Sequence, residues 1–231
     1  MDFAIRIFAR WEITESITIM ITETTTSTWV VMALLTILAL AVRRSINKWD
    51  PNKAPTGFQN VIEMAVEMFE NLFKNNGSSK LMFLAPWFFS LFAFLIVSNW
   101  VGLVGLRPPT ADWSMTFPLA FSSLMLFQFA GLKVRPKAYL KGIFLEPVFI
   151  FAPINLIGEI AKPVALSFRL FGNMLGGMIL LQLIYGMAPM FIRFIFPVAL
   201  HLYFDLAAGV LQAFIFTMLC ITFIGLASNE D

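Results

Sequence analysis

The chain has 231 residues, of which 59% are hydrophobic and 13% are charged, against roughly 25% charged residues in a soluble globular domain. With 26 Phe and a mean hydropathy of +0.81, it has too few polar residues to cover one globule, which excludes a soluble protein and indicates an integral membrane protein. The single Cys excludes a disulfide framework, and the single His argues against His-rich metal sites and against a Cys/His or Ser/His/Asp catalytic relay. The net charge of +2 is too small to indicate a nucleic-acid partner.

Five stretches are apolar enough to cross a bilayer core, which requires about 20 residues in a helix. The first combines the short apolar run Trp29–Val42 with the uncharged segment Thr24–Thr28. It is a poor signal peptide, because Arg43 and Arg44 follow it where a cleavage site of small residues would be needed. The other four stretches contain no charged residue and are Leu81–Leu106, Ser114–Leu132, Leu170–Ile192 and Leu206–Asn229.

The Lys and Arg residues outside these stretches predict the orientation of the chain. Ten of them lie in two segments, Arg43–Lys80 and Lys133–Lys141, whereas three, Arg6, Arg10 and Arg107, lie on the other side. Positively charged loops are cytoplasmic as a rule. The N-terminus is therefore expected outside and, after five crossings, the C-terminus inside.

Residues 1–28 are expected to form an N-terminal outer segment, and residues 29–231 a single membrane domain. Within that domain, residues 57–74 place Val61, Met64 and Met68 at helical spacing, with glutamates between the apolar positions. This pattern predicts an amphipathic helix on the cytoplasmic membrane surface, with the glutamates solvated.

Residues 147–226 predict a long helical hairpin. Each of its two stretches has about 40 residues and would reach roughly 60 Å, twice the thickness of the hydrocarbon core. Either the helices lie strongly tilted, or Pro153, Pro163 and Pro197 divide them into kinked pieces. The predicted fold class is an all-α integral membrane protein, with about five transmembrane helices, one interfacial amphipathic helix, and a final pair forming a long, strongly tilted antiparallel hairpin.

Ionisable residues at membrane depth are functional candidates, because each is costly to place there. Six fall in the hairpin: Glu159, Lys162, Arg169, Arg193, His201 and Asp205. On a helix, Arg169 shares a face with Ala165, Gly172 and Gly176. This face either packs within the subunit with Arg169 paired internally, or it admits a helix of another molecule that interacts with Arg169.

The second half of the hairpin carries a similar stripe of polar and small residues. His201, Asp205, Ala208, Gly209 and Gln212 are spaced to share one face. His201 is either part of a polar path or an interfacial, hydrogen-bonded histidine. Asp205 is harder to explain by packing, since a buried carboxylate needs a partner or a raised pKa.

Several motifs resemble those of subunit a of F-type ATP synthases, in its bacterial form. KPVALSFRLFGN, at Lys162–Asn173, is similar to the family signature around an intramembrane arginine, and FDLAAGVLQAFIF, at Phe204–Phe216, is similar to its last helix. Three shorter matches are SNWVGL at Ser98–Leu103, PTAD at Pro109–Asp112 and PINLIGE at Pro153–Glu159. The resemblance covers residues 57–227.

The resemblance implies a role for Arg169 as the stator arginine that faces a rotor ring of proteolipid c subunits. It implies that Asn173 and Gln212 are polar residues grouped near that arginine. The sequence departs from the family at Met178, where many members have Glu, and at Asp205, a position often occupied by His. A carboxylate is thus missing at position 178 and present at position 205, which suggests that the group that relays ions has moved to Asp205.

The function that the resemblance implies is ion translocation in the membrane sector of an ATP synthase. Two aqueous half-channels would meet the rotor ring and couple the flow of H+ or Na+ to rotation. Peripheral-stalk b subunits, the remaining synthase subunits and membrane lipid would be its other partners, in a bacterial plasma membrane. No cofactor is expected. Because the chain has no GxxxxGK[ST], GxGxxG or HExxH motif, it is not expected to be an enzyme by itself.

The predicted ion path comprises Asn173, Gln212, Asp205, Asn99, Asp112, Glu159 and His201, beside Arg169. Asn99, Asp112 and Asp205 are expected at the outer half-channel. Alternatively, Asp112 caps the helix that follows it, and Asp205 only binds a neighbouring donor such as His201.

Two other classes of function compete with this one. A self-contained secondary transporter or channel would be expected to show paired repeats around a midplane site, whereas here no internal repeat is visible and buried charge lies in one half of the chain. A structural scaffold would not require Arg169 and Asp205.

Overall fold

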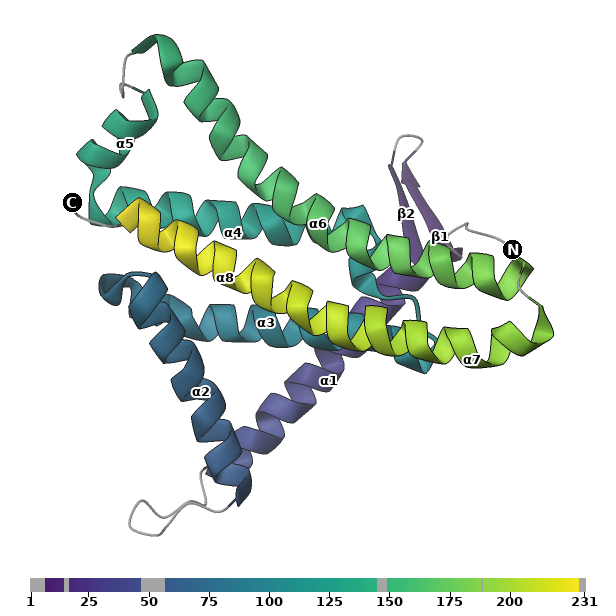
Figure 1. Ribbon diagram of the computed structural model, residues 1–231. Coiled ribbons are helices and arrows are strands. Elements are labelled where there is room, and N and C mark those ends of the chain that lie inside the picture. The colour runs from purple at the N-terminus through teal and green to yellow at the C-terminus, as the bar shows by residue number, and fades with distance from the viewer. Residues whose placement is uncertain (1–6, 15–16, 47–56, 145–148, 188, 229–231) are drawn as a thin grey trace. The chain divides into compact units, whose positions relative to one another are not determined.

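The computed structural model describes residues 7–14, 17–46, 57–144, 149–187 and 189–228 (Figure 1). In this part of the chain, five helical segments are long and apolar enough to cross a membrane: Glu23–Ile46, Lys80–Val104, Trp113–Val134, Ala152–Met187 and Phe196–Ser228. The predicted all-α membrane fold is confirmed. The predicted start of the long hairpin, residues 147–148, and the predicted end of the last span, Asn229, lie outside the described residues.

The first span, α1 (Glu23–Ile46), includes the Thr/Ser segment that precedes its apolar run. The Oγ1 atom of Thr22 accepts a hydrogen bond from the backbone N–H of Thr25 at 3.3 Å, which satisfies one of the free donors at the start of the helix. Inside the helix, the hydroxyls of Ser27 and Thr28 donate to the carbonyls four residues earlier, at 3.0 and 2.7 Å. These bonds allow hydroxyl side chains to lie in an apolar setting.

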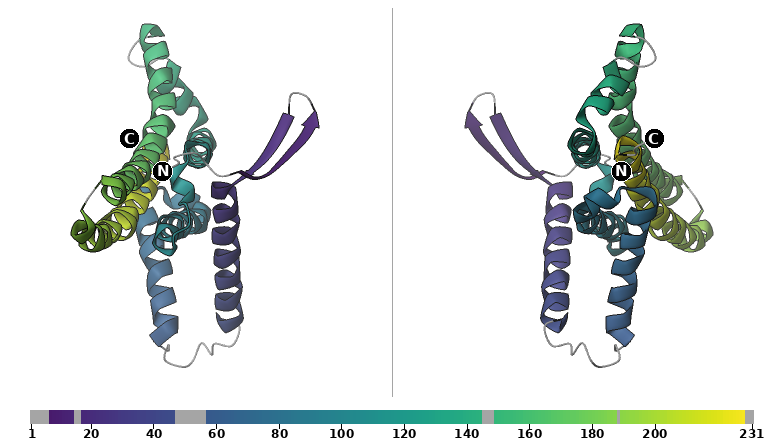
Figure 2. Two further views of the ribbon diagram at one scale, coloured as in Figure 1. Left: turned by 90° about the vertical axis from the view of Figure 1, so that its right-hand side faces the viewer. Right: turned by 90° about the vertical axis from the view of Figure 1, so that its left-hand side faces the viewer.

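Two strands precede α1 and were not predicted. β1 (Ile7–Thr14) and β2 (Ile17–Thr22) pair antiparallel, with Arg10 opposite Met20 and Trp11 opposite Ile19. Figure 2 shows this hairpin leading directly into α1.

The predicted amphipathic helix is confirmed as α2 (Gly57–Asn76). It buries Phe69 and Phe73, which contact Phe89 and Phe88 of α3 (Ala85–Trp100) at ring-centroid distances of 5.2 and 6.0 Å. A 3-10 helix at Ser79–Leu84 connects α2 with α3. The location of α2 on the membrane surface stays a prediction.

The basic loop after the third span forms a short helix, α5 (Pro136–Phe144), which follows α4 (Trp113–Val134). Tyr139 of α5 packs on Gly131 of α4 so closely that a Cβ at Gly131 would lie 2.6 Å from the Tyr139 ring. Glycine at this position therefore allows α5 to fold back onto α4.

The long hairpin consists of α6 (Ala152–Met187), α7 (Met190–His201), a π-helical turn (Leu202–Ala208) and α8 (Gly209–Ser228). Pro163 and Pro197 lie inside helices and do not divide them. The 36 residues of α6 would extend about 54 Å along the helix axis, and this length requires a tilt in a core about 30 Å thick. The side chains of residues 190–195, Arg193 among them, lie outside the description.

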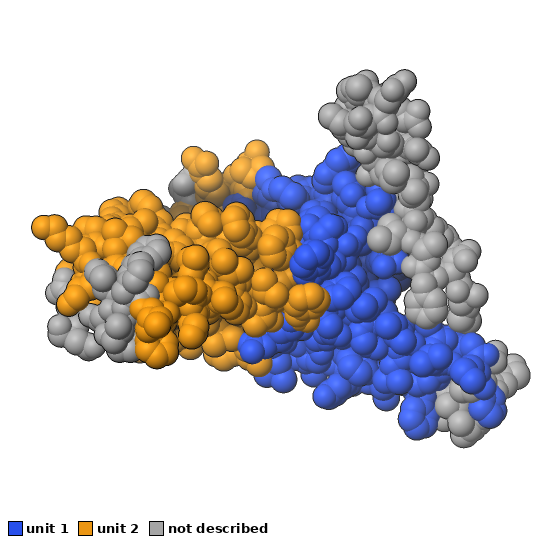
Figure 3. Space-filling model, turned by 90° about the horizontal axis from the view of Figure 1, so that it is seen from above, with its two compact units in different colours: residues 1–39, 93–116, 169–213 blue, residues 40–92, 117–168, 214–231 orange. Residues whose placement is uncertain are grey.

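The chain forms two compact units (Figure 3). Unit 1 comprises residues 1–39, 93–116 and 169–213, and unit 2 comprises residues 40–92, 117–168 and 214–231. Unit 1 buries Leu95, Leu170 and Met174, among others, and unit 2 buries Phe88, Phe127 and Phe216. Apolar side chains also remain exposed, as Ile37, Ile157 and Leu211 show. This outward apolar surface is suited to lipid.

Candidate functional site

Arg169 lies at the middle of α6, and its side chain is exposed. Within the described part of the chain, it makes no ion pair or hydrogen bond. A Cβ added at Gly172 or Gly176, on the same face, would meet no atom within 4 Å. No contact among the described residues supports the alternative in which Arg169 is paired internally. An unpaired charge at membrane depth costs roughly 3 kcal/mol or more, so this open face is suited to a carboxylate of another molecule.

Two amides in unit 1 have unused hydrogen-bonding groups. Asn173 lies one turn after Arg169 on α6, and Gln212 lies in the first turn of α8. The Asn173 Nδ2 and Gln212 Nε2 atoms are buried and have no partner among the described residues. A buried donor left without a partner costs about 1–3 kcal/mol. Both amides are therefore placed to bind water or a group that arrives from outside the chain.

Asp205 lies in the π-helical turn and is only 6% exposed. Its Oδ2 atom is 2.6 Å from Nδ1 of His201, one turn earlier, so the imidazole is hydrogen-bonded to the carboxylate. Gly102 packs against the same group, because a Cβ there would lie 3.2 Å from Oδ2. Turns of π-helix are frequent at functional sites. His201 is therefore the hydrogen-bond partner that the buried Asp205 carboxylate requires.

Asp205 and His201 line a cavity of about 380 Å³ in unit 1, which we call the Asp205 cavity. Met178, Gln182 and Tyr185 of α6 form another part of its wall. The remaining lining residues are Leu181 of α6, Glu23, and a loop segment of Gly102, Gly105, Leu106, Arg107 and Pro108. The Asp205 carboxylate and the apolar Met178 thus belong to one cavity, and the relocation of a relay group to Asp205 stays a prediction.

Asn99 is fully buried, and both ends of its amide are hydrogen-bonded. Its Nδ2 donates to the carbonyl of Gly209 at 2.9 Å, and its Oδ1 accepts from the Thr110 hydroxyl at 2.6 Å. Asn99 is not among the residues that line the Asp205 cavity. It holds α3 against the start of α8, and its role in the ion path stays a prediction.

Asp112 caps the first turn of α4. Its Oδ1 atom accepts hydrogen bonds from the backbone N–H and the hydroxyl of Ser114, at 3.0 and 2.8 Å. The other carboxylate oxygen accepts from the Thr24 hydroxyl of α1 at 3.2 Å. This is the arrangement of an N-cap residue, and the part of Asp112 in the ion path stays a prediction.

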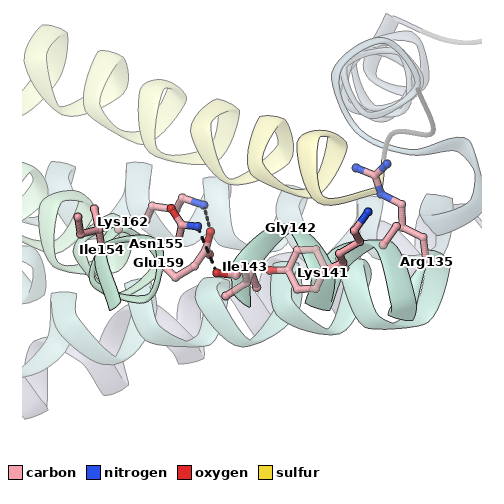
Figure 4. A pocket seen from close by; sticks show the side chains of 11 residues that line it. Arg135, Lys141, Gly142, Ile143, Ile154, Asn155, Glu159 and Lys162 are labelled. Carbon is pink, nitrogen blue, oxygen red and sulfur yellow. Dashed lines mark hydrogen bonds and ion pairs between the residues drawn. The ribbon is translucent and has the colours of Figure 1, made fainter. Parts of the chain in front are cut away.

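Glu159 lines a larger cavity, of about 1060 Å³, in unit 2, which we call the Glu159 cavity (Figure 4). Lys162 donates to its Oε1 atom at 2.5 Å, and Gln128 of α4 donates to its Oε2 atom at 3.2 Å. Asn155, one turn before Glu159, also lines the cavity and donates to the carbonyl of Ile143 at 3.2 Å. This cavity is rich in polar groups.

Tyr139 extends the Glu159 network to α5. Its hydroxyl donates to Oε1 of Gln128 at 2.7 Å, so a chain of hydrogen bonds runs from Tyr139 through Gln128 to Glu159. Burial and the negative charge of Glu159 raise the pKa of Tyr139 to about 12. The hydroxyl therefore stays protonated at neutral pH and keeps donating.

Sequence reasoning missed four polar residues of the Asp205 cavity: Glu23, Arg107, Gln182 and Tyr185. The Nε atom of Arg107 and the Oε1 atom of Gln182 are buried and unpaired within the described part of the chain. One signal was available, since Gln182 is a polar residue in a predicted apolar span, four residues after Met178. Among the described residues, no three His, Cys, Asp or Glu side chains gather to form a metal site.

Comparisons with known proteins place the chain in a family. A model of the ATP synthase A chain family matches residues 25–225. ATP synthase subunit a of Desulforamulus reducens is 34% identical over 203 residues, which cover 85% of this chain and 76% of the relative.

Two further relatives agree with this match. The sodium ion specific ATP synthase subunit a of Propionigenium modestum is 34% identical over 223 residues, or 88% of this chain and 73% of the relative. ATP synthase subunit a of Moorella thermoacetica is 33% identical over 204 residues, or 87% of this chain and 88% of the relative. The family match spans most of the chain, including the five candidate spans except their outermost residues. The chain is a membrane protein of the ATP synthase A chain family, whose members are the a subunits of ATP synthases.

Proposed function

We propose that the chain is the ion-translocating stator subunit in the membrane sector of an F-type ATP synthase, and that Arg169 gates ion transfer. The observation that carries this proposal is the exposed Arg169 side chain, which has no counter-charge among the described residues and lies on a face of open glycines. Arginine does not lose its proton in proteins. Its guanidinium therefore attracts an ionised carboxylate without carrying an ion itself.

The carboxylate that Arg169 attracts is carried by a ring of proteolipid c subunits. When a neutralised carboxylate of the ring reaches Arg169, the guanidinium displaces the bound ion into one half-channel, and the ionised site then takes up the next ion from the other half-channel. Each elementary charge that crosses 100 mV releases about 2.3 kcal/mol. That free energy drives rotation of the ring.

We assign each of the two cavities, within its own unit, to one of the two half-channels. The Asp205 cavity, in unit 1, opens the outer path and brings ions to Asp205 and His201. The Glu159 cavity, in unit 2, opens the inner path beside Glu159 and Lys162. The distribution of Lys and Arg supports this assignment, because the basic helix α5 lines the Glu159 cavity and basic segments are cytoplasmic as a rule.

The other partners follow from the same role. Peripheral-stalk b subunits hold this chain against the turning ring, and the remaining subunits of the synthase bind and hydrolyse nucleotide. The chain lies in a bacterial plasma membrane with its N-terminus outside and its C-terminus in the cytoplasm. The chain conducts ions and performs no nucleotide chemistry of its own.

The coupling ion is H+ or Na+. One relative is named as sodium ion specific, whereas the names of two others give no ion. The ligands around the rotor carboxylate, on another chain, select between the two ions.

The experiment that tests this role compares Arg169→Ala and Arg169→Lys with the unaltered complex in liposomes. Both variants should assemble and lose ATP-driven ion flux by at least about 100-fold, as expected when an electrostatic group acting on the transferred charge is removed. Lys fails because a desolvated ammonium can lose its proton. Arg44→Ala, which removes an exposed charge from the last turn of α1, is the control and should keep its flux. Normal flux in the Arg169→Ala complex would overturn the proposal.

A further inference from the structure

We propose that Gln182 is an ion-path residue of the Asp205 cavity. Its side-chain amide binds the water that carries a proton, or the water shell of a small cation, on the way to Asp205. It supplies there the polar group that Met178 does not offer. This inference rests on the proposed function, which gives the cavity its role as an access path.

The position of Gln182 supports this role. Gln182 and Met178 are one helical turn apart on α6, and both line the Asp205 cavity. Asp205 and His201 reach the same cavity from the other arm of the hairpin. Gln182 is therefore the amide that α6 contributes to the cavity.

The hydrogen bonding of Gln182 is incomplete within the described chain. Its Oε1 atom is buried and has no partner there. A buried acceptor without a partner costs about 1–3 kcal/mol, whereas a bridging water satisfies such a group at little cost. The cavity of about 380 Å³ has room for on the order of ten waters. We therefore assign a bound water to the Gln182 amide.

Three polar side chains of unit 1 are already engaged, whereas the Nε atom of Arg107, in the cavity wall, is also buried and unpaired within the described chain. His201 binds the Oδ2 atom of Asp205, both ends of the Asn99 amide are hydrogen-bonded, and Asp112 caps α4. An amide offers one acceptor and two donors and does not titrate. Gln182 can thus pass a hydrated cation or a water-borne proton onward without trapping it as a fixed negative charge would.

The first experiment measures water access. Gln182→Cys and Leu183→Cys, each in a Cys220→Ser background, are compared in the intact complex in liposomes. Leu183 is the matched control, because it is the next residue, is 49% exposed and is not among those that line the cavity. A charged methanethiosulfonate should react at least about tenfold faster at position 182 and should block ion flux there only. Equal reaction rates at the two positions would overturn the inference.

The second experiment separates conduction from folding. Gln182→Leu should lower ATP-driven ion flux about tenfold while leaving assembly intact, and Gln182→Asn should recover part of the flux. In the Gln182→Leu background, Met178→Glu should restore flux, because it returns a polar group to the wall one turn away. Each variant is assayed with and without Na+, so that transport of a proton and of a cation are distinguished. Full flux in Gln182→Leu would contradict the inference.

The failure of this inference is distinguishable from that of the proposed function. If Arg169→Ala abolishes flux while Gln182→Leu does not, the stator role stands and only the role of Gln182 fails. If Arg169→Ala retains flux, the proposed function fails whatever the labelling at position 182 shows.

Discussion

Asp205 and Met178 are the two positions at which the resemblance of the motifs predicts a relocated relay group. Both line one cavity, and Asp205 is buried and bound to His201. The hydrogen bond satisfies the carboxylate, but it is also the arrangement that a transfer group needs, since proton transfer requires a partner within hydrogen-bond reach. The geometry of the His201–Asp205 hydrogen bond thus fits both an ion-relay role and a purely structural role for Asp205, and a substitution at Asp205 distinguishes the two.

Asp205→Asn removes the negative charge and keeps the shape of the side chain. If Asp205 transfers ions, flux should fall by at least about tenfold while the complex keeps its thermal stability. In a proton-coupled enzyme, Met178→Glu combined with Asp205→His should restore part of the rate, because it rebuilds the commoner arrangement. Flux and unfolding midpoint are measured on the same preparation. Undiminished flux with lowered stability would leave Asp205 a structural partner of His201.

Arg169 and Asp205 were assigned to the candidate site because a charge within an apolar helix stands out in the sequence, and their roles stay predictions. Arg107 and Gln182 were not assigned, because helical periodicity gives the face of one helix and does not tell which residues of separate helices share a cavity. The two hydrogen bonds of Asn99 could not be predicted for the same reason, because its partners, Gly209 and Thr110, lie on different segments of the chain.

Among the helices, α5 connects the basic loop with Glu159. The Tyr139 hydroxyl holds Gln128, which in turn donates to Glu159, and the Tyr139 ring packs on Gly131. Arg135, just before α5, donates to the carbonyls of Leu226 and Ala227 at 3.2 and 3.4 Å, in the last turn of α8. A cation at a helix C-terminus is favourable. These contacts fix the wall of the Glu159 cavity.

Tyr139→Phe should therefore change stability in a pH-dependent way. Burial and Glu159 raise the pKa of Tyr139 from 10.0 to about 12, so the folded chain holds the phenolic proton more tightly than the unfolded chain. This contribution is complete below pH 10.0 and is lost as the pH rises toward about 12. The variant should unfold at a lower temperature at pH 8 and lose less stability above pH 10.

The measurement is the thermal unfolding midpoint of the complex across this pH range. Tyr203→Phe is the control, because Tyr203 is 61% exposed and lies in the π-helical turn, away from α5 in the chain. Parallel pH curves for Tyr139→Phe and the unaltered complex would show that Tyr139 does not hold this proton.

Helical elements were predicted more closely than strands. The amphipathic pattern predicted residues 57–74 and the helix is Gly57–Asn76, since periodic burial fixes a helix well. The strands Ile7–Thr14 and Ile17–Thr22 were missed, because the Glu15-Ser16 connection lacks the Asn-Gly or Asp-Gly signal of a tight hairpin. The sequence does not decide whether Pro163 divides α6. A proline can kink a helix, but membrane helices tolerate it when neighbouring groups satisfy the freed backbone carbonyl, and α6 is continuous.

Across the whole molecule, the proposed function depends on what meets the face of Arg169. That face is open in the described chain, because a Cβ added at Gly172 or Gly176 would meet no atom within 4 Å. Small residues let two helices approach closely. A rotor helix with a carboxylate at the same depth would fill this space and supply the missing counter-charge.

The most direct measurement is cross-linking of Gly172→Cys to a cysteine placed beside the rotor carboxylate, in the intact synthase with Cys220→Ser. Leu38→Cys on α1, at a side chain 55% exposed, is the control. We expect an oxidised dimer of this chain with the proteolipid from position 172 only, and ATP-driven ion flux that stops on oxidation and returns on reduction. Cross-linking from position 38 and none from position 172 would contradict it.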